Sequence, residues 1–481
     1  MIGRKREHED PHIRSFHELL SGHNPVLYKK EDLLAYDCDG FTIHKHLPKA
    51  VVFPENTKEV ASIVRYCHDH NLPFLARGAG TGLSGGAIPI NGEVIISLVR
   101  MKRLLEVDLK NRRAIVEPGY VNIKLTQFIE DKGYYYAPDP SSQYCCTIGG
   151  NVAENAGGAH CLKYGVTTNH ILGMEVVLPN GDIVEIGKAG ILDEPGYDLL
   201  GLMTGSEGTL GIVTKITVRI LKHPEAKQTV LAYFDKVSDA SHTVSDIISE
   251  GIVPAALEMM DRIAMEGVEA AAFPIGHLLD AEAVLLIEVD GISAGMDQQI
   301  ERILTVCRKH HVREVKVATS EEERMKWWAN RKTGFGAMGA ISPDYLVQDG
   351  VIPRTKLPVV LSTIQKISET YGLRIANIFH AGDGNLHPLV LFDATVEGET
   401  ERALQAGSEC LRACAAVGGT ITGEHGIGIE KKEEMRFVFT EEEINAQLEI
   451  RQVFNPRNLL NGGKLFPSPS RCVEIKQSLN K

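Results

Sequence analysis

The chain has 481 residues, of which 43% are hydrophobic and 24% are charged, and its formal net charge at pH 7 is −12. This length predicts two or three domains, and this composition is typical of a globular protein in water. The negative charge argues against a general nucleic-acid-binding protein, because phosphate binding requires a basic surface. No apolar run approaches the ~20 residues that a membrane-spanning helix needs, so we expect no direct membrane span.

The nine cysteines are scattered along the chain and include no CxxC pair. Such a set fits reduced thiols in a cytoplasmic protein better than a disulfide framework or an iron–sulfur site. Cys410 and Cys414 share one face of an expected helix, a spacing that suits helix packing and, less well, metal binding. Residues 1–10 are charged but no apolar segment follows them, so we do not expect a secretory signal.

The predicted elements of the first half alternate short strands with helices, behind a polar helical lead-in over residues 1–42. Apolar residues recur at helical spacing over 57–68, with Thr57 as the candidate N-cap. The strands are predicted at 51–54, 72–76, 94–98, 114–119 and 211–221. The last of these strands closes the first structural unit.

The pattern after about Pro224 predicts a second unit of α+β type. Residues 281–289 form a long apolar run that is expected to be a central strand of a sheet. Around it we expect a strand at 229–234 and helices at 237–250, 293–310 and 320–335. Residues 454–464 are loop-rich, and a polar tail follows them.

Two short stretches, 380–387 and 423–428, carry the residues with the clearest chemistry. The first is expected to be a β-hairpin, because the residue types at 382–385 tolerate positive φ at a tight turn. Such a hairpin brings His380 and His387 together on neighbouring strands. Two imidazoles and a carboxylate, here that of Glu424, form a common divalent-metal triad with open positions for water or substrate. His425 need not be a ligand and is a candidate base, so the pattern predicts an enzyme with metal-assisted proton abstraction.

Three glycine-rich segments occupy residues 77–87, 147–158 and 201–211. The backbone N–H groups of such a loop can bind an anion, and a diphosphate is the natural ligand. The first segment is neither the dinucleotide fingerprint nor a phosphate loop, so by itself it indicates either nucleotide binding or a structural turn. Three such segments in one unit favour a long ligand such as FAD, which needs several lines of backbone contact.

Together these segments resemble the FAD-linked oxidases of the vanillyl-alcohol-oxidase (PCMH-type) superfamily. Within it they are most similar to the group that holds the FAD-binding subunit of glycolate oxidase and the D-lactate and D-2-hydroxyglutarate dehydrogenases. The resemblance covers nearly the whole chain, and it rests on residues 77–87, 136–142, 148–158, 204–211, 341–345, 349–354, 380–387 and 423–428.

The resemblance implies an α+β fold with three parts behind the lead-in. A PCMH-type FAD-binding domain of two subdomains is expected over 43–222, and a ferredoxin-like α+β cap that holds the substrate over 223–425. The C-terminal segment, 426–481, is expected to return to the FAD-binding domain. Thr81 stands where relatives with covalently bound flavin often carry histidine, so FAD is expected to be non-covalent.

The resemblance also implies which residues bind FAD. Those expected around the pyrophosphate are Arg77, Gly78, Ala79, Gly80, Thr81 and Gly82. Those expected to line the flavin are Pro138, Ser142, Gly150, Asn151, Ser206, Gly208 and Ile212. Further candidates for FAD contact are Gly85, Gly149, Gly157, Gly205, Glu207 and Asn461. Residues 461–464 depart from the usual Asn-Pro-Gly-Lys of relatives, which leaves the tail's flavin contact open.

The implied reaction is oxidation of a small (R)-2-hydroxy acid, glycolate or D-lactate, to the 2-oxo acid. A metal (zinc, manganese or iron) on His380, His387 and Glu424 lowers the pKa of the substrate hydroxyl, His425 removes its proton, and flavin takes the hydride. Arg331 is the candidate clamp on the substrate carboxylate, with a surface arginine as the alternative reading. Lys332 is a weaker candidate for that clamp. Asn385 either contacts metal or substrate or only shapes its turn.

The electron acceptor must come from outside the chain, which has neither an iron–sulfur cysteine pattern nor a nicotinamide fingerprint. The resemblance implies iron–sulfur and FAD-like partner subunits, or an electron-transferring flavoprotein. Membrane association is expected only through such partner subunits. Two alternatives are a metal-free sugar or alditol oxidase of the same superfamily and a flavin-binding electron-transfer subunit, and the histidine–glutamate pattern disfavours both.

Overall fold

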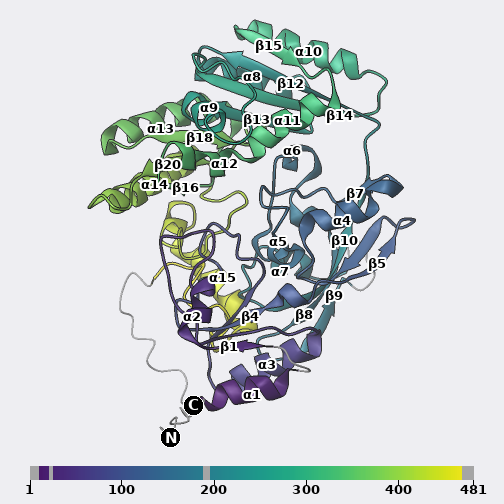
Figure 1. The fold of residues 1–481 in the computed structure, drawn as a ribbon, viewed down its shortest axis with the longest axis vertical. Coiled ribbons are helices and arrows are strands. Elements are labelled where there is room, and N and C mark those ends of the chain that lie inside the picture. Colours follow the sequence, from purple (N-terminus) through teal and green to yellow (C-terminus); the bar gives the residue numbers. More distant parts are fainter. Residues whose placement is uncertain (1–9, 21–24, 188–194, 469–481) are drawn as a thin grey trace, which may run out of the picture.

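The computed structural model describes residues 10–20, 25–187 and 195–468. The outer parts of the expected lead-in and tail, 1–9 and 469–481, lie outside these ranges. Figure 1 shows a first unit, coloured purple to blue, below a second unit, coloured teal to green, with the yellow C-terminal segment beside the first. Within the described ranges, no helix combines the length and the apolarity needed to cross a membrane.

The lead-in is helical only in part. Helix α1 (Pro11–Leu19) is capped by Asp10, whose carboxylate accepts from the backbone N–H of His12 at 2.9 Å, and it buries Ile13 and Phe16. The single turn α2 (Lys30–Leu33) and the short strand β1 (Val26–Leu27) follow.

The first sheet has the strand order β1-β2-β4-β3. Strands β2 (Ala50–Val52) and β3 (Phe74–Arg77) both run parallel to β4 (Val94–Ser97). Helix α3 (Thr57–Asp69) crosses between β2 and β3. Its N-cap is Asn56, whose side chain accepts from Glu59 N at 3.0 Å, and Thr57, predicted as the cap, is the first helical residue.

The second sheet is antiparallel, with the strand order β5-β6-β10-β8-β9. Its strands are β5 (Leu104–Asp108), β6 (Arg113–Val116), β10 (Ile212–Arg219), β8 (Ile171–Val177) and β9 (Ile183–Ile186). Helices α4 (Asn122–Ile129) and α5 (Ile148–Glu154) pack on it through apolar side chains. Short elements complete the unit: β7 (Tyr134–Tyr135), β11 (Leu221–Lys222), α6 (Cys161–Tyr164) and α7 (Leu199–Met203).

The second unit is built on an antiparallel sheet with the strand order β15-β12-β14-β13-β18-β20-β16. Its strands are β12 (Ala226–Phe234), β13 (Ala256–Asp261), β14 (Ala283–Gly291), β15 (Glu314–Val317), β16 (Asp344–Val347), β18 (Ile375–Phe379) and β20 (Pro388–Phe392). Strand β14 lies between β12 and β13, so the predicted central strand at 281–289 is confirmed. The α+β class is confirmed as well.

Helices cover both faces of this sheet. Successive strand residues point to opposite sides, and apolar residues on both sides need to be covered. In β14, Leu285 and Ile287 join one core and Val284 and Leu286 join the other. The first core is covered by α8 (Val237–Ser249), α10 (Met296–Lys309), α13 (Leu357–Tyr371) and α14 (Glu399–Ala416). The second core is covered by α9 (Arg262–Glu269), α11 (Glu321–Lys332) and α12 (Gly334–Ala337).

Cys410 and Cys414, on α14, are buried in the first of these two cores. The thiols therefore pack as small apolar groups, as the first of the two alternatives for this pair predicts.

The C-terminal segment contains α15 (Glu441–Phe454) and then runs back to the first sheet. Phe74 N donates to Leu459 O at 2.9 Å, and Asn461 N donates to Phe74 O at 2.8 Å. These bonds add the segment to the free edge of β3, the strand that leads into the first glycine-rich loop.

The predicted hairpin is confirmed. Strands β18 and β20 are antiparallel, with Asn377 opposite Pro388, and His380 pairs with Asn385 across the turn. The turn is followed by β19 (Asn385–Leu386), which pairs with β17 (Gly350–Val351). Gly384 has a φ of +75°, and a Cβ there would lie 2.1 Å from the carbonyl oxygen of Ile352.

We expect Gly384→Ala to lower the free energy of unfolding by about 2–5 kcal/mol, because it adds a backbone clash to the left-handed conformation. Gly372→Ala is the matched control: its φ is +63°, but the new Cβ would meet open space. The control is expected to lose only about 1–2 kcal/mol. Thermal unfolding of both variants measures the difference, and equal losses would contradict a steric role of the Ile352 carbonyl.

Candidate active site

A cavity of about 390 Å³ is lined by all three glycine-rich segments. The predicted FAD residues on its wall are Arg77, Gly78, Ala79, Gly80, Thr81, Gly82, Ser142, Gly149, Gly150, Asn151, Ser206, Glu207, Gly208, Ile212 and Asn461. The remaining four, Gly85, Pro138, Gly157 and Gly205, are not among the lining residues that the structure describes. Residues of the wall that sequence reasoning missed include Asp39 and Glu154.

The first loop places a buried cation beside the cavity. The guanidinium of Arg77 lies 5.5 Å from the ring centre of Tyr36, and burial lowers the pKa of Arg77. Gly80 has a φ of +70°, and a Cβ on it would lie 2.3 Å from Nη2 of Arg77. The positive φ favours glycine at this position, and the absent Cβ leaves room for the guanidinium, an arrangement that suits an anionic group such as a diphosphate.

Helix α5 begins at the cavity wall. The Thr147 hydroxyl caps it by accepting from Gly150 N at 3.3 Å. A Cβ on Gly149 would lie 2.8 Å from the carbonyl oxygen of Pro118, so the glycine permits the close approach of the two segments. Five of its residues border the cavity, which is consistent with the backbone contact that the sequence predicts for this segment.

The three predicted metal ligands come together in the structure. Nε2 of His380 lies 3.1 Å from Oε1 of Glu424, and Nε2 of His387 lies 3.2 Å from the same oxygen. One ligand atom from each residue lies within 4.8 Å of the other two. Both histidines are buried, and neither ring nitrogen of His387 has a hydrogen-bond partner within the described residues. A buried set of two imidazoles and one carboxylate fits a divalent cation.

The charged groups of this triad shift each other's pKa. Burial lowers the pKa of His380, but the carboxylates of Glu258 and Glu424 raise it by more, so that the pKa lies well above its usual value. The opposite holds for Glu424, whose pKa lies well below its usual value despite burial, because His380 and His387 surround it. A divalent cation bound to this triad would compete with the proton of His380 and release it.

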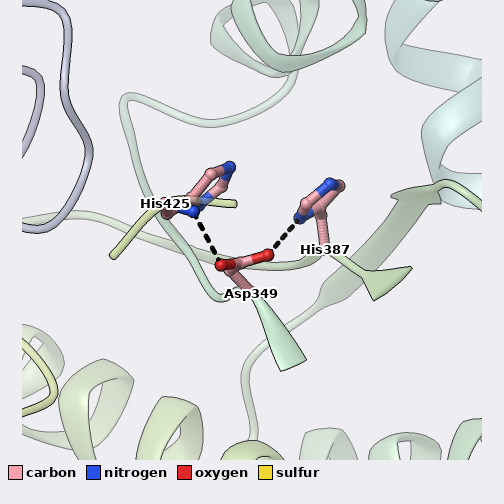
Figure 2. Close-up of side chains that lie close together, drawn as sticks. All are labelled: Asp349, His387 and His425. Carbon is pink, nitrogen blue, oxygen red and sulfur yellow. Dashed lines mark hydrogen bonds and ion pairs between the residues drawn. The ribbon is translucent and has the colours of Figure 1, made fainter. Parts of the chain in front are cut away.

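Asp349 is the residue behind the second histidine, and sequence reasoning assigned it no role. Figure 2 shows its carboxylate between His387 and His425, with one oxygen directed at each residue. Oδ1 lies 3.6 Å from Nδ1 of His387, and Oδ2 accepts from the backbone N–H of His425 at 2.9 Å. The same Oδ2 accepts from the Thr422 hydroxyl at 2.6 Å and from the N–H groups of Gly423 and Glu424.

The segment 423–428, which carries Glu424 and His425, is also bound to the first unit. Glu207 accepts from the N–H groups of Ile427 and Gly428 at 2.6 and 2.7 Å. The Ser84 hydroxyl donates to the carbonyl oxygen of His425 at 2.9 Å. The segment is thus held by Asp349 from the second unit and by residues of two glycine-rich loops from the first.

His425 borders the cavity and stacks on His387, with ring centres 4.8 Å apart and an angle of 7° between the planes. Burial lowers the pKa of His425 to about 4, so the ring is neutral at pH 7 and can accept a proton. Its Nε2 lies 3.9 Å from Oε1 of Glu424. Phe335, also on the cavity wall, meets the His387 ring edge-on at 5.5 Å and supplies an apolar surface there.

The predicted substrate residues Arg331 and Asn385 lie close to this centre. Arg331 on α11 is only 4% exposed, so the alternative of a surface arginine is wrong. Its Nη2 lies 2.5 Å from Oε2 of Glu258, a short ion pair whose angles do not make it a hydrogen bond. Asn385 packs against Gly423, where a Cβ would lie 2.6 Å from its Cγ. Lys332, the weaker candidate, is engaged by Asp139 at 3.0 Å.

Two family models match the chain. The FAD binding domain model covers residues 48–187, and the model described as FAD linked oxidases, C-terminal domain covers residues 223–465. The cavity between the three glycine-rich segments reaches the buried residues Glu424 and His425. Together with the two family matches, this arrangement defines a flavin-dependent oxidoreductase. The chain belongs to the family of FAD-linked oxidases.

The chain is similar to relatives along most of its length. It is 46% identical to the glycolate oxidase subunit GlcD of Escherichia coli (strain K12), over 94% of this chain and 90% of the relative. It is 40% identical to GlcD of Bacillus subtilis (strain 168), over 91% and 93%. It is 33% identical to a D-lactate dehydrogenase of Anaerostipes hadrus, over 88% and 90%.

Solved structures share the fold at low sequence identity. The 4-ethylphenol oxidase of Gulosibacter chungangensis superposes with a TM-score of 0.78 at 18% identity, over 96% of this chain and 98% of the other. A p-cresol methylhydroxylase structure superposes with a TM-score of 0.77 at 18% identity, over 94% and 95%. The predicted PCMH-type fold is thereby confirmed.

Proposed function

We propose that the chain oxidises a small (R)-2-hydroxy acid such as D-lactate, or the prochiral glycolate, to the corresponding 2-oxo acid, with FAD and a divalent metal. The observation that carries the proposal is the position of His425: it borders the cavity and touches the His380, His387 and Glu424 triad. The names of the relatives, glycolate oxidase subunit GlcD and D-lactate dehydrogenase, support this substrate class.

The residues of the chain have separate tasks in this proposal. His380, His387 and Glu424 would hold a metal that supplies Lewis acidity to the substrate hydroxyl, and FAD in the cavity would supply the hydride acceptor. His425, neutral at pH 7, accepts the hydroxyl proton. Arg331 is proposed to bind the substrate carboxylate, and the apolar wall at Phe335 favours a small substrate over a dicarboxylate. Asn385 is proposed to support the same site.

The proposal extends to the cofactor linkage and the electron acceptor. FAD is expected to be non-covalent, because the loop position that would carry a histidine link holds Thr81 on the cavity wall. Electrons are proposed to leave to a partner, either iron–sulfur and FAD-like subunits or an electron-transferring flavoprotein. The name of GlcD, a subunit of glycolate oxidase, supports the first of these. A cytoplasmic location, with membrane contact only through partner subunits, completes the proposal.

Anaerobic bleaching of the flavin tests the proposed reaction. Purified protein is mixed with glycolate, D-lactate, L-lactate or D-2-hydroxyglutarate, before and after treatment with EDTA. We expect rapid bleaching by glycolate or D-lactate, little by L-lactate, loss of bleaching with EDTA, and recovery on addition of Zn²⁺, Mn²⁺ or Fe²⁺. Bleaching that EDTA does not change would contradict the proposed requirement for a divalent metal. No bleaching by any acid, with FAD bound, would favour a sugar or alditol oxidase.

A further inference from the structure

Glu258 is a buried carboxylate in the middle of the second unit's sheet, and the proposed reaction gives it no role. The side chain is 1% exposed and lies on β13, between β14 and β18. Both of its oxygens lie 2.9 Å from Nδ1 of His380. Its Oε2 lies 2.5 Å from Nη2 of Arg331. One carboxylate thus contacts a proposed metal ligand and the proposed substrate clamp.

Strand pairing accounts for the first of these contacts. Met259 pairs with Phe379 and Met260 with Ile378, so the next position in this antiparallel register sets Glu258 opposite His380. The neighbours of Glu258 along the strand are apolar and enter the two cores. A carboxylate at such a position loses several kcal/mol of hydration, which only charged or donating partners can offset.

The geometry of the pair shows which atoms meet. Both oxygens of Glu258 face Nδ1 of His380 at 2.9 Å, and Nη2 of Arg331 lies against Oε2. A proton on Nδ1 of His380 is therefore donated to this carboxylate. An imidazole that donates from Nδ1 presents the lone pair of Nε2, and Nε2 of His380 is the atom that faces Glu424.

We propose that Glu258 is a positioning residue that sets two parts of the site at once. Through Nδ1 it fixes the tautomer and ring orientation of His380, and through its ion pair it holds the guanidinium of Arg331 beside the same histidine. Nε of Arg331 is buried and has no hydrogen-bond partner among the described residues, so the pair with Glu258 leaves this donor unsatisfied. This inference rests on the proposed function, because it assigns Glu258 to the metal and substrate of that reaction.

The chain offers a matched control in Glu288. This residue is also 1% exposed, lies on the neighbouring strand β14, and faces the same side of the sheet, with Ala256 as its cross-strand partner. Its Oε2 accepts from Thr229, Arg324 and Trp328 at 2.7, 2.9 and 2.6 Å. Glu288→Gln therefore removes the same buried charge without touching His380 or Arg331.

The experiment compares wild-type holoprotein with Glu258→Gln and Glu288→Gln. Zn²⁺ affinity is measured by competition with a fluorescent chelator, and KM and kcat by flavin reduction at saturating Zn²⁺. We expect Glu258→Gln to weaken Zn²⁺ binding about 10–100-fold and to raise KM, while Glu288→Gln stays within about twofold of wild type in both. Equal Zn²⁺ affinity in Glu258→Gln and wild type, or equal loss in both variants, would overturn the inference.

Two further arms keep the result interpretable. Arg331→Gln is expected to raise KM with little change in Zn²⁺ affinity, and to raise KM by a smaller factor when Glu258→Gln is already present, because both substitutions break one pair. Additive KM effects would overturn the coupling between the two residues, even if Glu258→Gln folded poorly. Wild-type protein that binds no Zn²⁺ or Mn²⁺ and ignores EDTA would instead refute the proposed function itself.

Discussion

His425→Ala is expected to retain FAD and to reduce its flavin about 10²–10⁴-fold more slowly than wild type, because the substitution removes only the group that accepts the substrate proton. The loop should survive, since the contacts of residue 425 with Asp349 and Ser84 use backbone atoms. Anaerobic stopped-flow bleaching with the preferred acid, at saturating substrate and metal, measures the loss.

The control for this variant is another buried histidine of the same unit. His277 contacts Tyr233 at 3.0 Å and Asn330 at 2.9 Å, and it is not among the described residues that line the cavity. His277→Gln is expected to reduce flavin at nearly the wild-type rate. FAD and metal content are measured for both variants. A wild-type rate in His425→Ala would show that another group is the base.

Asp349→Ala is expected to have the largest effect on the architecture of the site. The side chain is completely buried and binds the Thr422 hydroxyl and three consecutive N–H groups of the loop that carries Glu424. Burial raises the pKa of Asp349, but His425 and Lys431 lower it more, so the carboxylate is ionised. Its loss would free the loop and leave Lys431, whose Nζ lies 3.7 Å away, without this counter-charge.

We expect Asp349→Ala to lower the free energy of unfolding by about 3–5 kcal/mol and to weaken metal binding about 10–100-fold. Thermal unfolding with and without added Zn²⁺, together with metal content, measures both effects. Asp349→Asn keeps the shape and one acceptor oxygen, so its losses should be smaller. A variant with wild-type metal content and an unchanged unfolding temperature would contradict this role for Asp349.

The sequence was sufficient for the features that depend on local chemistry. The turn residues at 382–385 predict the hairpin, and the hairpin alone brings His380 and His387 together. The apolar run of β14 likewise predicts its central place, because a strand covered on both faces is apolar at most of its positions. Both predictions use spacing over a few residues, which sequence displays directly.

Glu258 and Asp349 could not be found in the same way. Each acts on a residue that is distant in sequence, and the contact depends on strand register or loop path, which propensity does not encode.

Gly157 shows a second limit of prediction from sequence. It was predicted to contact FAD, but a Cβ on it would lie 2.6 Å from Oε2 of Glu424, so its small size leaves room for the triad. Close approach to a cofactor and to a carboxylate both demand glycine, and sequence does not distinguish them.

The anchoring of residues 423–428 from both units has a consequence for how such enzymes can be recombined. Glu207 binds Ile427 and Gly428 from one side, while Asp349 binds His425 from the other. A cap domain from one oxidase grafted onto the flavin domain of another would therefore keep only one of the two carboxylates that hold the loop of His425. Domain exchange can change specificity here only when the exchanged segment includes the loop at 423–428 together with Asp349 and Glu207.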